Sequence, residues 1–545
     1  MKKSTSIIIG ILICLVVMGV SYFWATELMD SVYTYRSPLH NAPPLPGKVL
    51  GAPNTRSIVI VLIDALRYDT SLDSDVMPFL NQLRDEGASA LMHSRPLSYS
   101  EPGYAVLLTG AWPDLSDGPA LNLDYADIPT FTQDNIYSAA HRAGFLTAVS
   151  GFNWFEKLIP QQAVSVSFYT EGEDQKADRQ VTDAALPWLW AGRYPLVLIH
   201  LDQVDYAGHY EGGPIDPRWD AAATRADKLL KEIALAMDLT QDTLLVVSDH
   251  GQIDRGGHGG QDPIVLLEPF VMVGKGVIPG KYSDIQMVDV APTVAAILGT
   301  SIPATNQGHP QIAMLDITLT QVNQINSALT AQQAQLVQAY KTAIGSPVTV
   351  TQSEDIVSAA QTGMDAARES LLDKQRLPRG IIAIVLIFMF INLAAWHARP
   401  YFSWMMVGVV GYLLIFNIKY ILVDHKTYSL SSVIDATNLI ESTALTALIA
   451  LFVGWLLVLL GTKGYQLRPR KAAAMTLKFI LTTLSILSIP IFIHYAINGA
   501  TITWALPNFF ISFLGLLFLI QVLIVSVIGL FFTGISALVG FFARK

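Results

Sequence analysis

Carboxylates and imidazoles recur in this sequence directly after short apolar runs, where they could bind metal ions. One such residue alone carries little information, because an aspartate at the end of a strand usually caps a helix or lies in a turn. Three carboxylates and three histidines converging on one rim would suffice for a site that holds two divalent ions. The candidates are Asp64, His200, Asp202, Asp205, His209, Asp249, His250 and, in a glycine-rich stretch, His258.

Such a pair of ions would suit phosphoryl transfer. Two divalent ions about 4 Å apart can stabilise both the attacking and the leaving oxygen of that reaction. An ion that binds a hydroxyl side chain also lowers its pKa, so that the oxygen can act as a nucleophile near neutral pH. Ser98 and Ser100 precede an apolar segment at 105–108 and could place a hydroxyl at the start of a helix. A helix N-cap is the commoner role for a serine there, so spacing alone favours the N-cap over the nucleophile.

These residues need elements to position them, and the sequence predicts alternating strands and helices. Continuous β-branched runs are typical of strands buried on both faces of a parallel sheet. The helical segments include one that ends at Gly299, a typical helix C-terminus. We therefore expect a doubly wound, mostly parallel α/β domain, in which ligands bind beyond the carboxyl ends of the strands. The expected strands are residues 57–63, 195–199, 243–247 and 270–273, and the expected helices are 78–86, 217–237 and 290–298.

The motifs around the candidate residues resemble those of the alkaline phosphatase superfamily, in particular its type I phosphodiesterase/nucleotide pyrophosphatase branch. The resemblance covers residues 57–315 and implies an alkaline phosphatase-like fold. It also implies that Ser100 is the nucleophile, since SEPGYAVLLTG (100–110) has a hydroxyl residue two positions before proline. Sulfatases share this fold but need an arginine where this chain has Tyr104, which argues against sulfatase chemistry. The other matching motifs are VLIDALRYD (61–69), VDYAGH (204–209), SDHGQ (248–252) and GGHGG (256–260).

The resemblance also implies how the ligands divide between two divalent ions. Asn122 lies near the position of the asparagine that holds a phosphoryl oxygen in the pyrophosphatases, one residue out of register. Zinc is the metal that the family implies, and manganese or magnesium would satisfy many of the same ligands. One ion would take Asp205, His209 and His258, and the other would take Asp64, Asp249, His250 and the Ser100 oxygen.

Hydrophobicity is uneven along the 545 residues, of which 52% are hydrophobic and 14% charged. A soluble protein carries about 25% charged residues. An apolar run at 7–24 predicts an uncleaved signal anchor, and the runs after residue 379 predict a transmembrane bundle. The expected parts are a signal anchor (1–25), a linker (26–56), the catalytic domain (57–317), a helical connector whose second helix stops at Pro378 (318–378), and a domain of about five transmembrane helices (379–545).

Basic residues predict the orientation of these spans. Lys2 and Lys3, the loop 463–471, and Arg544 and Lys545 all fall on the cytoplasmic side if the chain crosses six times, which puts the catalytic domain outside. The last apolar run, 509–542, is long enough to leave open one tilted helix, a helix with an interfacial segment, or two spans. Six spans in total are favoured, since two spans there would put Arg544 outside. The sequence contains no Asn-x-Ser/Thr site, which favours a prokaryotic source.

The layout is similar to that of the glycosylphosphatidylinositol ethanolamine phosphate transferases. This resemblance implies an enzyme: a membrane-bound two-metal phosphodiesterase or phosphotransferase that forms a covalent phospho-enzyme on Ser100. The spans favour a membrane lipid as substrate, such as a phosphoethanolamine headgroup, or a lipid-linked acceptor. The net charge of −9 argues against nucleic acid as a partner. A tethered hydrolase of soluble phosphodiesters or nucleotides and a non-catalytic transporter or scaffold stay open as alternatives, and so does the oligomeric state.

Overall fold

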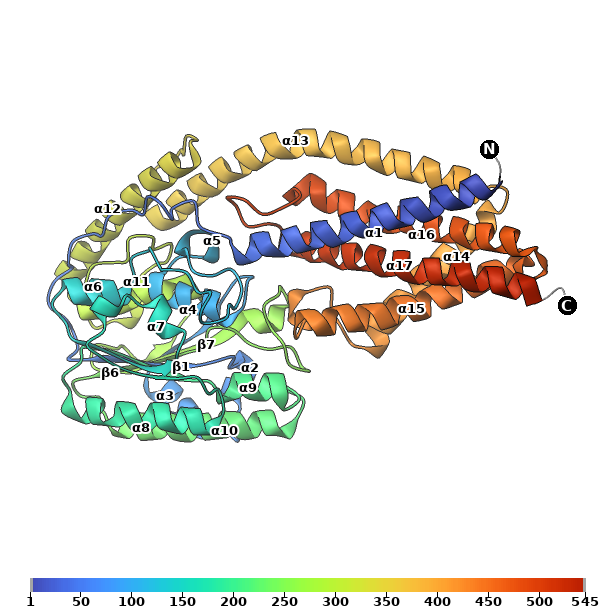
Figure 1. Ribbon diagram of the computed structural model, residues 1–545. Helices are drawn as coiled ribbons and strands as arrows, with labels where there is room; N and C mark the ends of the chain where they lie inside the picture. The colour runs from blue at the N-terminus through green and yellow to red at the C-terminus, as the bar shows by residue number, and fades with distance from the viewer. Residues whose placement is uncertain (1–2, 543–545) are drawn as a thin grey trace. The chain divides into compact units, whose positions relative to one another are not determined.

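The structure is a computed structural model that describes residues 3–542. It divides into two compact units, an α/β unit of residues 33–371 and a helical unit. The helical unit contains the described residues up to Val32 and from Leu372 onward. Figure 1 shows the sheet of the α/β unit between two layers of helices.

A nine-stranded sheet forms the centre of the α/β unit, in the order β4-β3-β5-β1-β6-β7-β2-β8, with β9 paired to β2. Strands β4, β3, β5, β1 and β6 are parallel to one another, and β7 runs antiparallel to β6 and β2. The expected α/β fold with a mostly parallel sheet is therefore confirmed. The strands are β1 (Ile58–Ile63), β2 (Ala88–His93), β3 (Thr147–Phe152), β4 (Val166–Thr170), β5 (Leu196–Leu201), β6 (Thr243–Val247), β7 (Leu267–Gly274), β8 (Gly280–Lys281) and β9 (Ile285–Gln286).

One expected strand runs in the opposite direction. The apolar run 270–273 predicts a further parallel strand, but β7 pairs antiparallel with β6. The chain between these two strands contains only the short 3₁₀ helix η2 (Pro263–Leu266), and antiparallel neighbours need no crossover helix. Strand β7 is nevertheless buried on both faces, so its apolar run reports burial and not direction.

The central strands of the sheet are buried on both faces because they alternate their side chains between two hydrophobic cores. In β1, Ile60 and Leu62 belong to one core, while Val61 and Ile63 belong to the other. Helices α4, α6 and α11 contribute to the first core, and α3, α8 and α10 contribute to the second (Figure 1). The helices of this unit are α2 (Tyr68–Leu72), α3 (Pro78–Glu86), α4 (Ser100–Thr109), α5 (Pro113–Ser116), α6 (Ile136–Arg142), α7 (Phe155–Leu158), α8 (Gln175–Ala191), α9 (Gln203–Tyr210), α10 (Pro217–Leu235), α11 (Val290–Leu298) and α12 (Leu319–Ile344).

Within the described residues, six helices are long and apolar enough to cross a membrane, as expected for a multi-pass membrane protein. The last of them is one continuous helix, which agrees with six spans in total. Three of the basic residues used to predict the orientation of the spans lie outside the described residues, namely Lys2, Arg544 and Lys545. The six are α1 (Lys3–Tyr33), α13 (Ile356–Ala398), α14 (Phe402–Asn417) with its π-helical continuation η5 (Ile418–Val423), α15 (Ala436–Gly461), α16 (Pro469–Asn498) and α17 (Phe509–Phe542).

Two predicted boundaries differ from the structure. Helix α1 continues past residue 25 to Tyr33, so the first part of the expected linker is helical. Pro378 does not end the second connector helix, because α13 runs through it to Ala398. The residues at 381–391 are apolar, and a helix satisfies their backbone groups without water. A proline that removes one hydrogen bond is tolerated in such a segment.

Candidate metal centre and active site

The carboxyl ends of three neighbouring parallel strands, β5, β1 and β6, form the rim of the site. Ile63 in β1 lies opposite Leu201 in β5, and the Asp64 amide that follows donates to the Leu201 carbonyl at 2.9 Å. Helix α9 begins just after β5 and carries Asp205 and His209 four residues apart, so that both side chains lie on one face. The sheet topology therefore brings together residues from three separate parts of the sequence.

Asp64, Asp249 and His250 form one buried group of possible metal ligands. His250 Nε2 lies 3.5 Å from Asp64 Oδ1 and 3.3 Å from Asp249 Oδ2. The Ala65 amide donates to Asp249 Oδ1 at 3.2 Å. Asp64 Oδ1 and Asp249 Oδ2 are buried and make no hydrogen bond with any described residue. Because a buried carboxylate oxygen without a partner is costly, these two atoms fit a bound cation.

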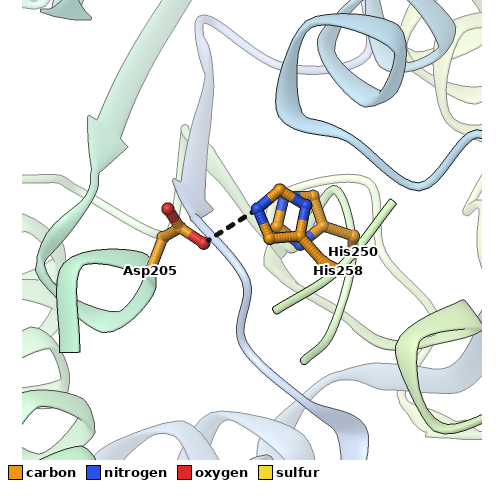
Figure 2. Close-up of side chains that lie close together, drawn as sticks. All are labelled: Asp205, His250 and His258. Atoms are coloured by element: carbon orange, nitrogen blue, oxygen red, sulfur yellow. Dashed lines mark ion pairs between the residues drawn. The ribbon is translucent and has the colours of Figure 1, made fainter. Parts of the chain in front are cut away.

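A second group meets on the other side of His250. His258 Nε2 lies 3.6 Å from Asp205 Oδ1 (Figure 2). His209 Nε2 lies 3.3 Å from Asp205 Oδ2 and 2.9 Å from His258 Nε2. Asp205, His250 and His258 also form a possible ligand group. The structure thus brings all six predicted ligand side chains together, but it puts His250 within reach of both groups and not of one alone.

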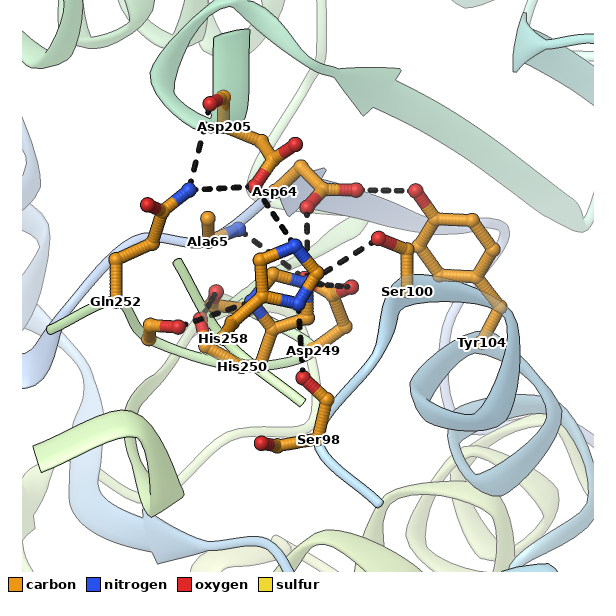
Figure 3. Close-up of polar contacts among 12 residues, drawn as sticks. Asp64, Ala65, Ser98, Ser100, Tyr104, Asp205, Asp249, His250, Gln252 and His258 are labelled. Carbon is orange, nitrogen blue, oxygen red and sulfur yellow. Dashed lines mark hydrogen bonds and ion pairs between the residues drawn. The ribbon is translucent and has the colours of Figure 1, made fainter. Parts of the chain in front are cut away.

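Hydrogen bonds fix the proton positions of the two inner histidines. His250 Nδ1 lies 3.1 Å from the Gly251 carbonyl, and His258 Nδ1 lies 3.0 Å from the Ser98 carbonyl. A carbonyl can only accept, so both Nδ1 atoms carry hydrogen, and in the neutral form of each ring the lone pair is on Nε2. Figure 3 shows these two side chains at the centre of the polar cluster. Imidazole nitrogens in this state are ready to bind metal.

The charges of the site shift its pKa values in opposite directions. Burial raises the pKa of the Asp249 carboxyl well above its ordinary value. Burial is the largest influence on the pKa of Asp205 and acts to raise it, but the charge and hydrogen bond of His209 and the charges of the two other histidines together outweigh burial, so this pKa lies below its ordinary value. Asp205 in turn raises the pKa of His209 to about 9. Burial lowers the pKa of His258 well below its ordinary value, which keeps this imidazole in its neutral, metal-binding form.

Ser100 begins α4 and points into the ligand set. Its Oγ lies 3.2 Å from His250 Nε2 and 3.4 Å from Asn122 Nδ2. Gly103 permits this approach, because a Cβ there would lie 2.9 Å from Asp249 Cβ and 3.0 Å from the Asp249 carbonyl oxygen. Ser98, the other candidate, has its Oγ engaged with the loop, since it donates to the Gly260 carbonyl and accepts from the Gly259 amide.

Two residues contact the predicted ligands although no motif assigned them a catalytic role. Tyr104 donates a hydrogen bond to Asp64, and His200 Nε2 lies 2.9 Å from Asp64 Oδ2. The sequence indicated His200 as a candidate ligand at the end of its strand. It indicated Tyr104 only as the residue that stands where sulfatases need an arginine. Asp64, His200 and Asp202 also lie close enough together to form a third group of possible ligands.

Residues 130–377 match the protein family described as type I phosphodiesterase / nucleotide pyrophosphatase. Among curated proteins, the catalytic subunit of GPI ethanolamine phosphate transferase 2 from Homo sapiens is 27% identical over 326 residues, 54% of this chain and 32% of that protein. The catalytic subunit of GPI ethanolamine phosphate transferase 3 from Mus musculus is 27% identical over 282 residues, 46% of this chain and 25% of that protein. The matches thus span about a third or less of each relative.

Among solved structures, human ectonucleotide pyrophosphatase/phosphodiesterase 5 matches with a TM-score of 0.40 and 13% identity, over 48% of this chain and all of that one. The domain match and the similarity to the transferases together support an enzyme of the alkaline phosphatase superfamily with a type I phosphodiesterase domain. This agrees with the resemblance drawn from the motifs. Both curated relatives are mammalian, so they lend no support to the expected prokaryotic source.

Proposed function

We propose that this chain is a membrane-bound two-metal phosphotransferase that uses Ser100 as its nucleophile and moves a phosphoethanolamine-type headgroup. The observation that carries the proposal is the position of Ser100 Oγ, 3.2 Å from His250 Nε2 and within the ligand set. A hydroxyl among carboxylates and imidazoles has the composition that phosphoryl transfer needs. The relatives are ethanolamine phosphate transferases by name, which supports the choice of headgroup.

In the proposed reaction, Ser100 Oγ attacks phosphorus and its hydroxyl proton passes to solvent, which also supplies the proton for the leaving alcohol. The Oγ–P bond forms as the P–O bond to the leaving alcohol breaks, and that alcohol takes up a proton. An acceptor hydroxyl then attacks the same phosphorus, the Oγ–P bond breaks, and Ser100 regains a proton. An alcohol as acceptor gives a new phosphodiester, whereas water gives a phosphomonoester.

Asn122 is the proposed donor to a phosphoryl oxygen. Its Oδ1 accepts a hydrogen bond from the Glu101 amide at 3.0 Å, which turns its NH₂ group toward Ser100. An amide donor fixed in this way meets the developing negative charge without having to reorient. In the sequence, Asn122 is one residue out of register with the family motif. Its contact with Ser100 nevertheless supports the proposed role.

The ligand set would hold two divalent ions, which we propose to be zinc, because a mixture of imidazole and carboxylate ligands suits that metal. Manganese or magnesium would satisfy many of the same ligands. Bound ions would lower the pKa of the Ser100 hydroxyl and offset negative charge on the phosphoryl group. The proposed ligands are Asp205, His209 and His258 for one ion, and Asp64, Asp249, His250 and Ser100 for the other, with His250 near both groups.

A lipid substrate fits a chain whose described part contains six helices long and apolar enough to cross a membrane. The loop between α15 and α16 contains Lys463 and Arg468, and Arg470 and Lys471 follow within the first turn of α16. The positive-inside rule puts this basic segment in the cytoplasm. With six spans, the α/β unit would then face the extracytoplasmic side, where it would meet lipids of the outer leaflet.

The test uses purified full-length protein in liposomes that contain headgroup-labelled phosphatidylethanolamine and a lipid-linked acceptor with free hydroxyls. The proposal predicts label on the acceptor, dependent on divalent ions and lost in Ser100→Ala. Label released only into water, with equal turnover of soluble nitrophenyl phosphodiesters, would favour the tethered hydrolase. No turnover of any phosphodiester by the metal-loaded protein would contradict the proposal.

A further inference from the structure

The two oxygens of the Asp64 carboxylate have different surroundings. Oδ2 accepts a hydrogen bond from the Tyr104 hydroxyl and lies 2.9 Å from His200 Nε2 (Figure 3 shows the tyrosine contact). Oδ1 has no hydrogen-bond partner in the described part of the chain and lies 3.5 Å from His250 Nε2. The residue is only 1% exposed, so bulk solvent does not reach this oxygen. One oxygen is therefore held by protein and the other is free toward the proposed ions.

The tautomer of His200 follows from its second nitrogen. The Phe152 amide donates to His200 Nδ1 at 3.4 Å. Because an amide N–H can only donate, Nδ1 of the neutral ring is an acceptor and Nε2 carries the hydrogen. That hydrogen faces Asp64 Oδ2 and the Tyr104 oxygen, the latter 3.0 Å from Nε2. A protonated Nε2 is a hydrogen-bond donor and not a metal ligand, which argues against a third ion between Asp64, His200 and Asp202.

Packing holds both donors in place. A Cβ at Gly151 would lie 2.7 Å from His200 Cβ, so only glycine lets β3 pass this close to the histidine. The Phe155 ring stacks on Tyr104 at 4.6 Å and meets the His200 ring edge-on at 5.3 Å. Tyr104 and His200 are each 1% exposed. Neither donor can swing away from Asp64 without disturbing this aromatic packing.

We propose that Tyr104 and His200 are positioning residues that commit Asp64 Oδ2 to hydrogen bonds, so that Asp64 binds its metal through Oδ1 alone. The inference rests on the proposed two-metal function. A carboxylate free to rotate can bind an ion with one oxygen or with two, and its affinity falls when it is not preorganised. Removal of hydrogen-bond partners behind a metal ligand typically costs about 10–100-fold in metal affinity or activity.

Four variants of the full-length protein test this proposal. Tyr104→Phe removes only the hydroxyl, and His200→Leu removes the second donor. His200→Gln keeps an amide N–H near the position of Nε2 and serves as the conservative rescue. Tyr137→Phe is the matched control, since this equally buried tyrosine donates to the Ala148 carbonyl, away from the ligands. Metal content is measured by elemental mass spectrometry, affinity by competition with a chelator, and folding by thermal melting without metal.

We expect Tyr104→Phe and His200→Leu to weaken binding of one of two zinc ions by about 10–100-fold. His200→Gln should retain most of the affinity and Tyr137→Phe all of it, and saturating zinc should restore much of kcat to Tyr104→Phe. Unchanged affinity in a folded Tyr104→Phe protein would overturn the proposal and leave the two-metal function intact. Three ions in the wild type, with one lost in His200→Gln, would make His200 a ligand and overturn the proposal too. A wild type that binds no divalent ion would overturn both.

Discussion

The imidazole rings of His250 and His258 stack face to face, with centroids 3.9 Å apart and 10° between their planes. Both rings give their Nδ1 hydrogens to backbone carbonyls, so two Nε2 lone pairs lie side by side among carboxylates. A cation could therefore bind at the Nε2 edges of the two stacked rings. The stack therefore joins the two ligand groups of the site and accounts for the position of His250 within reach of both.

Ser100→Ala is expected to reduce kcat for phosphodiester cleavage by at least about a thousandfold, because it removes the proposed nucleophile. Ser98→Ala is the matched control. It removes two hydrogen bonds to the loop at Gly259 and Gly260, which costs about 1–3 kcal/mol of stability but leaves the chemistry in place. Steady-state kinetics and thermal melting of the two variants check this. A large loss of kcat in Ser98→Ala, with full activity in Ser100→Ala, would mean that Ser98 and not Ser100 is the nucleophile.

Asn122→Ala should lower kcat by about 10²–10³-fold, the usual effect of losing one donor to a developing oxyanion. Its amide lies 3.4 Å from Ser100 Oγ but contacts none of the six other proposed ligands through an identified hydrogen bond, so metal content should not change. Kinetics with a nitrophenyl diester and elemental mass spectrometry test both statements. A raised KM with unchanged kcat would show that Asn122 binds substrate and transition state equally.

Much of this fold could be predicted from the sequence because buried parallel strands leave a strong local pattern. The runs that became β1, β5 and β6 are continuous and β-branched, and each is buried on both faces. Strands β2 and β3 lack such a signal: ASALMH and TAVSGF mix small and polar residues, and tertiary packing makes them strands. The direction of β7 was also hidden, because burial and not orientation determines an apolar run.

The candidate ligands were predictable because they lie in short local motifs. The hydrogen bonds that hold these ligands come from residues far away in the sequence, which no local pattern reveals. Tyr104 reaches Asp64 from helix α4, and His200 reaches it from β5, the strand that pairs with β1 just before Asp64. The sharing of His250 between two groups also depends on the stacking of the His258 ring against the His250 ring, which no motif encodes. The helical path through Pro378 was missed because a proline usually ends or kinks a helix, whereas α13 continues through this one.

Glu101→Gln should remove a pH-dependent loss of stability. Burial raises the pKa of Glu101 to about 9 from 4.5, so the folded state keeps a proton that the unfolded state releases. Stability of the wild type therefore falls as pH rises between these values, by up to about 1.4 kcal/mol per pH unit from this group. The amide oxygen of the substituted side chain can still accept from the Leu123 amide, as Glu101 Oε1 does.

Thermal melting of both proteins in one chelator-containing buffer series from pH 5 to 8.5 measures this effect. Glu101→Gln should gain stability relative to the wild type as the pH increases, with the largest difference at the alkaline end. A constant difference between the two proteins across the series would mean that Glu101 is ionised in the folded state.

Gly103→Ala should displace the start of α4, because its Cβ would lie 2.9 Å from Asp249 Cβ. Overpacking of this kind costs about 1–3 kcal/mol, and here it also shifts Ser100 relative to Asp249. We expect a lower melting temperature and a loss of kcat. Gly47→Ala, where nothing lies within 4 Å of the added Cβ, is the control. Wild-type activity in Gly103→Ala would show that the helix start tolerates displacement.

Metal stoichiometry tests the central claim most directly. Full-length protein is loaded with zinc, freed of excess metal and analysed by elemental mass spectrometry beside Asp64→Asn and Asp205→Asn, which neutralise one carboxylate in each ligand group. The two-metal account predicts two ions per chain in the wild type and one in each variant. Fewer than two in the wild type, or two retained in both folded variants, would contradict it.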